Sequence, residues 1–142
     1  MIGCGYLGAV HAAAMASIGH DVIGIDTDPE KIAALAAGRA PFFEPGLDEL
    51  LASGVASGWL TFSADIADAH GAQVHFVAVG TPQQPDGSAA DLRYVHGALD
   101  ALHPQLRPGD VVAGKSTVPV GTAAGLAERV ADAGAVLVWN PE

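Results

Sequence analysis

The stretch Gly3-Cys4-Gly5-Tyr6-Leu7-Gly8 has the glycine spacing G-x-G-x-x-G, which is typical of a dinucleotide-binding turn. In such a turn Gly3 allows a sharp bend after a strand, Gly5 lets the backbone approach a pyrophosphate, and Gly8 lets the next helix pack against the sheet. The N-terminus of that helix would offer free N–H groups and a partial positive charge to the phosphates. Because the chain has 18 glycines, the spacing alone can arise by chance, and the flanking sequence has to decide.

The residues after the glycine stretch follow in the order that a dinucleotide site requires. Residues 9–18 are rich in alanine and predict an amphipathic helix that ends at Gly19. Residues 22–25 predict a short apolar strand, and Asp26 stands at its carboxyl end, 18 residues after Gly8. An acidic residue near this spacing accepts hydrogen bonds from the adenosine ribose. We therefore predict a dinucleotide site; the alternatives are a glycine-rich helix start in another α/β protein and, for Asp26, a helix N-cap.

Predicted strands and helices alternate along the chain. About six strands are expected, at residues 1–2, 22–25, 59–62, 74–79, 111–113 and 136–139. The longer helices are expected at residues 9–18, 27–38, 47–56, 91–106 and 122–132. This alternation predicts an α/β fold, a doubly wound Rossmann-type sheet that is mostly parallel, with helices on both faces. Since strands usually run about five to six residues, Met1-Ile2 indicates a truncated first strand.

Composition narrows the classes of protein to which this chain can belong. A length of 142 residues predicts one domain. The net charge is −10 with only six Lys and Arg, and these form no cluster, which argues against a nucleic-acid partner or an anionic membrane surface. An apolar run long enough to span a membrane, about 18 residues, and a signal peptide are both missing, so we expect a cytoplasmic location.

Cysteine and histidine usage points away from thiol and metal chemistry in this chain. The single cysteine, Cys4, permits no internal disulfide, which suits a reducing compartment. It lies inside the glycine stretch, where a small residue is needed for packing, so a nucleophilic role is not expected. The six histidines form no metal-binding pattern, and we predict no metal site.

Several further blocks occur in a fixed order after the glycine stretch. They are Gly19-His20-Asp21-Val22, Asp26-Thr27-Asp28, Glu44-Pro45-Gly46-Leu47, Val79-Gly80-Thr81-Pro82, Asp86-Gly87, Asp91-Leu92, Lys115-Ser116-Thr117-Val118-Pro119-Val120-Gly121-Thr122 and Asn140-Pro141-Glu142. With these blocks the chain resembles the N-terminal NAD-binding domain of the UDP-glucose/GDP-mannose dehydrogenase family, from Gly3 to Glu142. The Glu-Pro-Gly-Leu block and the block that starts at Lys115 are far more specific than the glycine spacing. One departure is Leu7, where the family usually has valine.

The resemblance implies NAD as the cofactor and assigns residues to it. The implied cofactor-binding residues are Gly3, Cys4, Gly5, Tyr6, Leu7, Gly8, Asp26, Lys31, Thr81 and Thr117. Asp28, and the lack of an arginine directly after Asp26, favour NAD over NADP, because a 2′-phosphate would meet two carboxylates. From the residues alone, Lys31 is equally well a solvated helix lysine and Thr81 a turn hydroxyl.

The resemblance also implies two catalytic residues, Thr117 and Glu142. Thr117 follows a predicted strand at the sheet edge where ligands bind in such folds, and the family places it near the nicotinamide and the reacting centre. The alternative for Ser116 and Thr117 is a pair of helix-capping hydroxyls. Glu142 matches a glutamate that the family assigns to acid–base work or to positioning water.

The activity that the resemblance implies is oxidation of the C6 alcohol of a nucleotide sugar to a carboxylate with two NAD+, through an aldehyde and a cysteine-bound thioester. The family's catalytic cysteine belongs to its C-terminal half, and nothing here matches its motif. The family's catalytic lysine is also absent. We therefore expect residues 1–142 to be an N-terminal fragment, without the central helix and the C-terminal UDP-binding domain, and inactive alone. In the full-length enzyme, which the family usually builds as a homo-oligomer, UDP-glucose is the favoured substrate.

Other interpretations stay open at this point. UDP-N-acetylmannosamine and GDP-mannose are alternative substrates, because the family's other half, which we expect to be missing here, largely determines which sugar binds. The chain could also be a non-catalytic, stand-alone dinucleotide-binding module. A β-hydroxyacid dehydrogenase is a further alternative, against which the block that starts at Lys115 argues.

Overall fold

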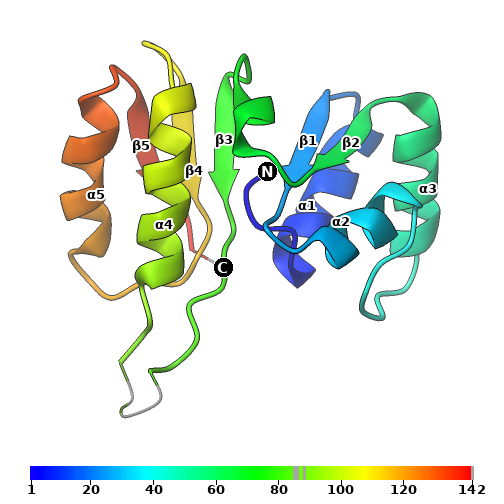
Figure 1. Ribbon diagram of the computed structural model, residues 1–142, viewed down its shortest axis with the longest axis horizontal. Coiled ribbons are helices and arrows are strands. Elements are labelled where there is room, and N and C mark those ends of the chain that lie inside the picture. The colour runs from blue at the N-terminus through cyan, green and yellow to red at the C-terminus, as the bar shows by residue number, and fades with distance from the viewer. Residues whose placement is uncertain (85–86, 88, 142) are drawn as a thin grey trace. The chain divides into compact units, whose positions relative to one another are not determined.

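The computed structural model of this chain describes residues 1–84, 87 and 89–141 (Figure 1). The chain divides into two compact units, Met1–Asp68 and Ala69–Glu142. Each unit alternates helices with parallel strands, which confirms the predicted α/β class. Two positions in the blocks named above, Asp86 and Glu142, lie outside the described residues.

The first unit is a two-stranded parallel sheet with three α-helices. Its elements are α1 (Tyr6–Ser17), β1 (Val22–Ile25), α2 (Pro29–Ala36), α3 (Leu47–Ser57) and β2 (Leu60–Ser63). Strands β1 and β2 pair in register from Val22 opposite Leu60 to Ile25 opposite Ser63. Helix α1 packs against α3 and β1, and its buried face carries only small residues: Gly8, Ala9, Ala12, Ala13 and Ala16. Small side chains let this helix approach the sheet closely, which places its N-terminus beside the end of β1.

The first strand of the prediction is reduced to a single bridge. Ile2 pairs with Ile25 in parallel, the Ile25 N–H donates to the Met1 carbonyl at 2.7 Å, and the Gly3 N–H donates to the Ile25 carbonyl at 2.8 Å. The Met1 amino group donates to the Ile23 carbonyl at 2.7 Å, and burial lowers its pKa. The described residues therefore form five strands, because Met1-Ile2 contributes one isolated bridge.

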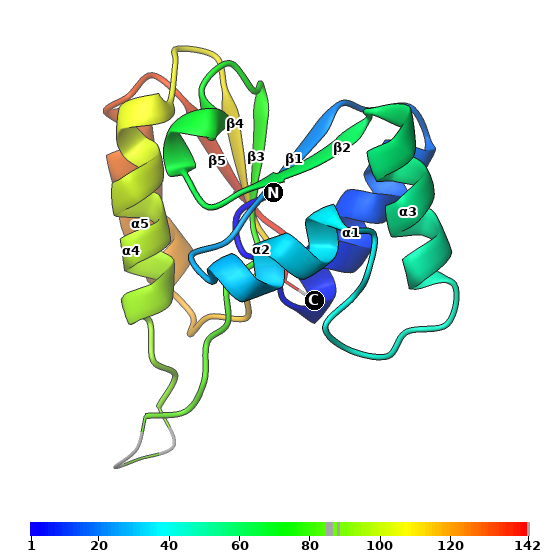
Figure 2. The same cartoon turned by 45° about the vertical axis from the view of Figure 1, so that its right-hand side comes forward.

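The second unit is a three-stranded parallel sheet in the order β3-β4-β5. Its elements are β3 (Val74–Val77), α4 (Arg93–Leu102), β4 (Val111–Gly114), α5 (Thr122–Ala131) and β5 (Val136–Trp139). Helices α4 and α5 lie on the same side of this sheet in both views (Figures 1 and 2). Helix α4 is shorter than the predicted 91–106, since Pro104 lacks an N–H and the chain continues as a 3₁₀ turn, His103–Gln105. Across the described residues, each helix is too short or too polar to cross a membrane.

A buried polar cluster lies where β3 and β4 begin. The side chains of His75 and Asp110 are almost fully buried, with His75 Nε2 and Asp110 Oδ2 3.4 Å apart. The same carboxylate oxygen accepts the Arg107 N–H at 2.9 Å. Burial lowers the pKa of His75, and the nearby Asp110 only partly offsets this. His75 is therefore the group in this cluster whose protonation opposes folding near neutral pH.

Stability of the chain is expected to fall as the pH drops from 7 to 5. The pKa of His75 is lower in the folded chain than its ordinary value of about 6.5, so the unfolded chain binds the extra proton first and unfolding is favoured on acidification. One such proton gives a slope of at most about 1.4 kcal/mol per pH unit. Urea unfolding followed by circular dichroism at several pH values measures this slope. His75→Gln should reduce the slope and His103→Gln, at an exposed histidine, should keep it; equal slopes in both variants would contradict the assignment.

Candidate functional site

The predicted glycine turn is formed at the start of α1. Gly3 has a φ of 87°, a left-handed conformation that favours glycine. Gly5 is the N-cap residue of α1 and gives no side-chain cap. At this end of the helix the Ala9 N–H donates to the Gly5 carbonyl at 2.9 Å. The N–H groups that precede Ala9 therefore form the kind of uncapped helix start that binds an anion.

Space for that anion exists in front of Gly5. A Cβ built on Gly5 would meet no heavy atom within 4 Å. The backbone at Gly5 (φ −68°, ψ −166°) is open to any residue, so conformation does not demand glycine there. Glycine here is the residue expected where a pyrophosphate approaches the backbone.

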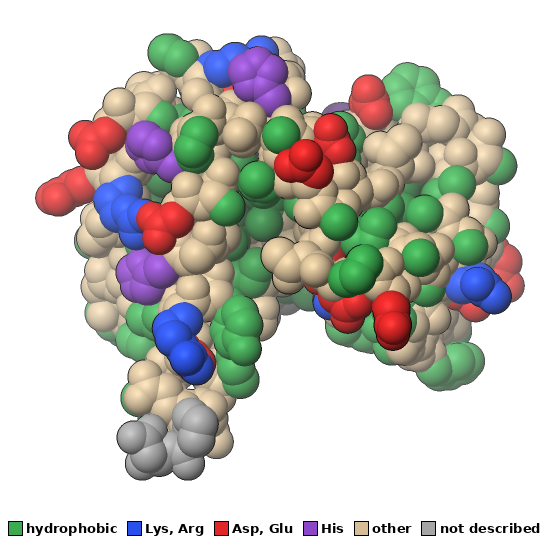
Figure 3. All heavy atoms as spheres, in the orientation of Figure 1, with side chains coloured by type: hydrophobic (Ala, Val, Ile, Leu, Met, Phe, Trp, Pro, Cys, Tyr) green, Lys and Arg blue, Asp and Glu red, His purple; other side chains and the backbone are tan. Residues whose placement is uncertain are grey.

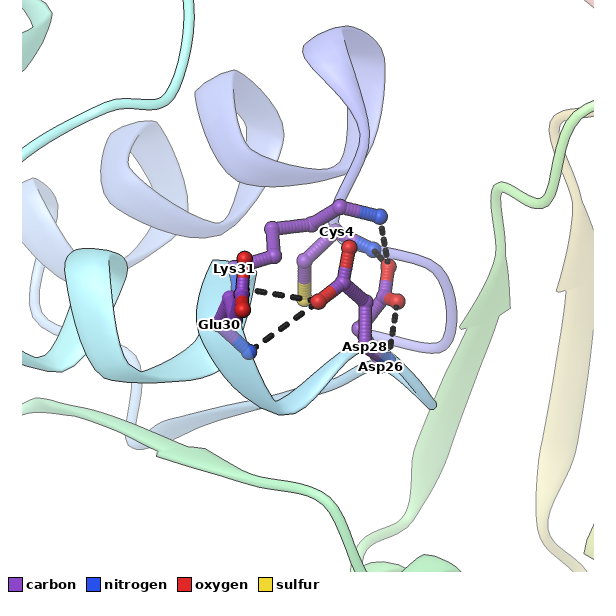
Figure 4. A network of polar contacts seen from close by, with 5 residues as sticks. All are labelled: Cys4, Asp26, Asp28, Glu30 and Lys31. Carbon is purple, nitrogen blue, oxygen red and sulfur yellow. Dashed lines mark hydrogen bonds and ion pairs between the residues drawn. The ribbon is translucent and has the colours of Figure 1, made fainter.

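Asp26 joins the glycine turn to the start of α2 (Figure 4). Its Oδ2 accepts the Cys4 N–H at 2.8 Å and the Lys31 ammonium at 2.9 Å, and its Oδ1 accepts the Asp28 N–H at 3.0 Å. The Asp26 side chain is only 10% exposed. Burial by itself would raise the pKa of Asp26, but Lys31 and the two N–H donors outweigh it and hold the pKa below its usual value. Asp26 is thus an ionised acceptor at neutral pH, held beside the turn.

The structure resolves two of the alternatives for this region. Asp28, not Asp26, is the N-cap of α2, since its Oδ1 accepts the N–H groups of Glu30 and Lys31 at 3.0 and 3.2 Å. The N-cap interpretation of Asp26 is therefore wrong. Lys31 is no free surface lysine, because it pairs with Asp26. Two acidic residues, Asp26 and Asp28, lie at this turn, with the Asp26 carboxylate accepting the Asp28 N–H, and this fits NAD better than NADP.

Tyr6 contacts the segment before α3, and the sequence analysis did not predict this contact. Its hydroxyl donates to Glu44 Oε2 at 2.5 Å, and its ring lies 5.3 Å, centroid to centroid, from that of Phe42. Glu44 belongs to the Glu-Pro-Gly-Leu block, so the specificity of that block was the signal that could have drawn attention to this contact. These two contacts hold the segment before α3 against Tyr6, the first residue of α1.

Cys4 has a packing role. It is fully buried, and burial raises the pKa of its thiol to about 12. A thiol with this pKa is protonated at neutral pH and is a poor nucleophile. Its contribution to the site is its backbone N–H, which binds Asp26.

The second group of predicted residues follows β3 and β4 in the second unit. The Thr81 hydroxyl donates to the Thr117 carbonyl at 2.8 Å, and the Ser116 hydroxyl donates to the Val79 carbonyl at 2.7 Å. These bonds tie the segment after β3 to the segment after β4. Ser116 is buried and Thr117 is exposed, and both lie at the carboxyl edge of the strands, the edge where ligands bind in parallel α/β sheets.

The predicted site residues thus form one group in each unit. The glycine stretch, Asp26 and Lys31 come together in the first unit, and Thr81 and Thr117 in the second. Glu142, the second predicted catalytic residue, lies outside the described residues. Within each unit, the Lys and Arg side chains on the face drawn in Figure 3 lie apart from one another and form no basic patch. The combination of N–H donors at an uncapped helix start and a carboxylate acceptor suits a dinucleotide.

Comparison with known proteins gives concordant matches. The model of the UDP-glucose/GDP-mannose dehydrogenase family, NAD binding domain, matches residues 1–142. A UDP-glucose 6-dehydrogenase of Rhizobium meliloti (strain 1021) is 50% identical over 123 residues, covering 86% of this chain and 28% of that protein. A UDP-glucose dehydrogenase structure from Pyrobaculum islandicum matches 99% of this chain and 34% of its own with 42% identity and a TM-score of 0.89.

A second solved structure has a different substrate in its name. The UDP-D-ManNAc dehydrogenase from Pyrococcus horikoshii matches 99% of this chain and 35% of its own with 29% identity and a TM-score of 0.93. This chain therefore spans about a third of the length of the proteins that it resembles.

Proposed function

The chain belongs to the UDP-glucose/GDP-mannose dehydrogenase family and represents its NAD-binding domain, and we propose that it serves an enzyme that oxidises UDP-glucose to UDP-glucuronate. When bound, NAD+ would accept the hydride that leaves C6 of the sugar. The observation that supports the proposal most is the Asp26 carboxylate bound to the Cys4 N–H beside the uncapped start of α1. That arrangement offers a ribose acceptor and a pyrophosphate site side by side.

Each unit contributes its own part to the proposed reaction. In the first unit, the N–H groups at the start of α1 bind the pyrophosphate and Asp26 accepts hydrogen bonds from the adenosine ribose hydroxyls. Lys31 stays close to the same ribose through its pairing with Asp26. In the second unit, Thr81 donates to the Thr117 carbonyl and orients this segment, and Thr117, which is an exposed residue, contacts the nicotinamide side of the reacting centre.

UDP-glucose is proposed over the other nucleotide sugars because the relative from Rhizobium meliloti, at 50% identity, and the structure from Pyrobaculum islandicum, at 42%, carry that substrate in their names. The UDP-D-ManNAc dehydrogenase is less similar in sequence, at 29%. A four-electron oxidation from alcohol to carboxylate consumes two NAD+ for each sugar, with water supplying the second oxygen.

The test is an assay of the complete enzyme that carries this domain. NADH formation is followed with UDP-glucose, GDP-mannose and UDP-N-acetylmannosamine at equal concentrations. UDP-glucose should have the highest kcat/KM, at least about tenfold above the others, and should yield two NADH per UDP-glucuronate. As the control, residues 1–142 alone should bind NAD+ and form no NADH. A different preferred sugar, or one NADH per sugar, would refute the proposed substrate or stoichiometry.

A further inference from the structure

Trp139, the last residue of β5, reaches across to the segment that follows β4. Its indole Nε1–H donates to the Ser116 carbonyl at 3.0 Å. Its ring lies over Gly114, where an added Cβ would overlap the ring atoms Cε3, Cδ2 and Cζ3. Gly114 has no left-handed φ, so glycine is needed there for space and not for conformation. The indole therefore occupies a place that a side chain at residue 114 would otherwise fill.

Residues 116–117, which follow β4, are hydrogen-bonded to the end of β5 and to the segment after β3. From β5, Trp139 binds the Ser116 carbonyl. From the segment after β3, Thr81 binds the Thr117 carbonyl, and the Val79 carbonyl accepts the Ser116 hydroxyl. The backbone of Ser116-Thr117 is thus held from both sides, while the Thr117 side chain remains exposed.

We propose that Trp139 is a positioning residue, which sets the Ser116-Thr117 backbone so that the Thr117 hydroxyl meets the nicotinamide half of NAD. The proposal rests on the role given above to Thr117. It concerns only the nicotinamide half, because the indole contacts the second unit's loop and the adenosine and pyrophosphate contacts belong to the first unit. Loss of the indole N–H should therefore weaken binding of NAD+ without weakening binding of a ligand that ends at the second ribose.

ADP-ribose is that ligand, since it keeps the adenosine and the pyrophosphate and lacks the nicotinamide. Trp139→Phe keeps an aromatic ring over Gly114 and removes the N–H donor. Because one hydrogen bond contributes about 0.5–1.5 kcal/mol, we expect NAD+ to bind roughly three- to tenfold more weakly to this variant by calorimetry. The affinity for ADP-ribose should stay the same. Trp59→Phe, at the other tryptophan of the chain, is the matched control and should change neither affinity.

NMR spectroscopy distinguishes a specific positioning role of Trp139 from a general loosening of the structure around it. The chain has two tryptophans, so an ¹H–¹⁵N spectrum shows two indole signals, and Trp59, 48% exposed, serves as the internal reference. The Trp139 signal should shift on addition of NAD+ and stay in place on addition of ADP-ribose. Gly114→Ala, which displaces the ring, should reproduce the selective loss of NAD+ affinity and should add nothing when Trp139 is already alanine.

The outcomes are distinct. Unchanged NAD+ affinity in Trp139→Phe, or an equal loss for NAD+ and ADP-ribose, would overturn the positioning role while the proposed function stands. If the wild-type chain bound neither ligand, the proposed function itself would fail, and the role of Trp139 with it.

Discussion

Gly5→Ala is expected to lower the affinity for NAD+ at least about 100-fold while the fold stays intact. The added methyl group meets no atom of the protein within 4 Å, and the backbone angles at Gly5 suit alanine. The methyl would instead occupy the space through which the pyrophosphate approaches the start of α1. Losing two hydrogen bonds to a charged group, each about 1.5–3 kcal/mol, accounts for a loss of this size.

Calorimetry with NAD+ and urea unfolding together test the Gly5 prediction. The unfolding free energy should change by no more than about 1 kcal/mol, the cost of a poorer N-cap. Gly97→Ala is the control, because Gly97 lies in α4 and a Cβ there also meets nothing within 4 Å. It should keep the affinity for NAD+ and stabilise the chain by up to about 1 kcal/mol. Retained NAD+ affinity in Gly5→Ala would show that the pyrophosphate does not approach this turn.

Asp26→Ala is expected to weaken both cofactor binding and the fold. Alanine removes the acceptor of the Cys4 and Asp28 N–H groups and the partner of the Lys31 ammonium. Leaving partly buried donors unpaired costs about 1–3 kcal/mol each, so the unfolding free energy should fall by about 2 kcal/mol or more. Because the pKa of Asp26 is held below its usual value, the stabilisation is fully present above pH ~4 and is lost as the pH falls further.

Binding measurements on Asp26 variants separate the effect of the Asp26 charge on cofactor affinity from the effect of its side-chain shape. NAD+ affinity should fall by about 10- to 100-fold in Asp26→Ala, since the ribose loses a charged acceptor. Asp26→Asn keeps the shape without the charge and should narrow the preference for NAD+ over NADP+, because a 2′-phosphate meets one carboxylate fewer. Asp21→Ala, at an exposed acidic residue, controls for net charge. Equal NAD+ affinity in wild type and Asp26→Ala would refute the ribose contact.

The order of elements could be predicted because its signals are local. The glycine spacing, the alanines of α1 and the apolar runs of β3 to β5 each depend on neighbours within one turn or one strand. The predicted ends of helices and strands were less accurate than their order. Helix α4 ends at Leu102 and not at residue 106, because Pro104 in the following turn prevents continuation. The expected strand at Met1-Ile2 forms one bridge only.

Sequence by itself determined the α/β alternation, the glycine turn and the identity of the acid at the end of β1, since each is encoded by residue type and short spacing. Only the tertiary structure decided which partner each polar group takes. Asp26 binds Cys4 across 22 residues, Thr81 binds Thr117 across 36, and Trp139 binds Ser116 across 23. Such pairs depend on strand register and on how closely helices pack, and no local pattern in the chain specifies either.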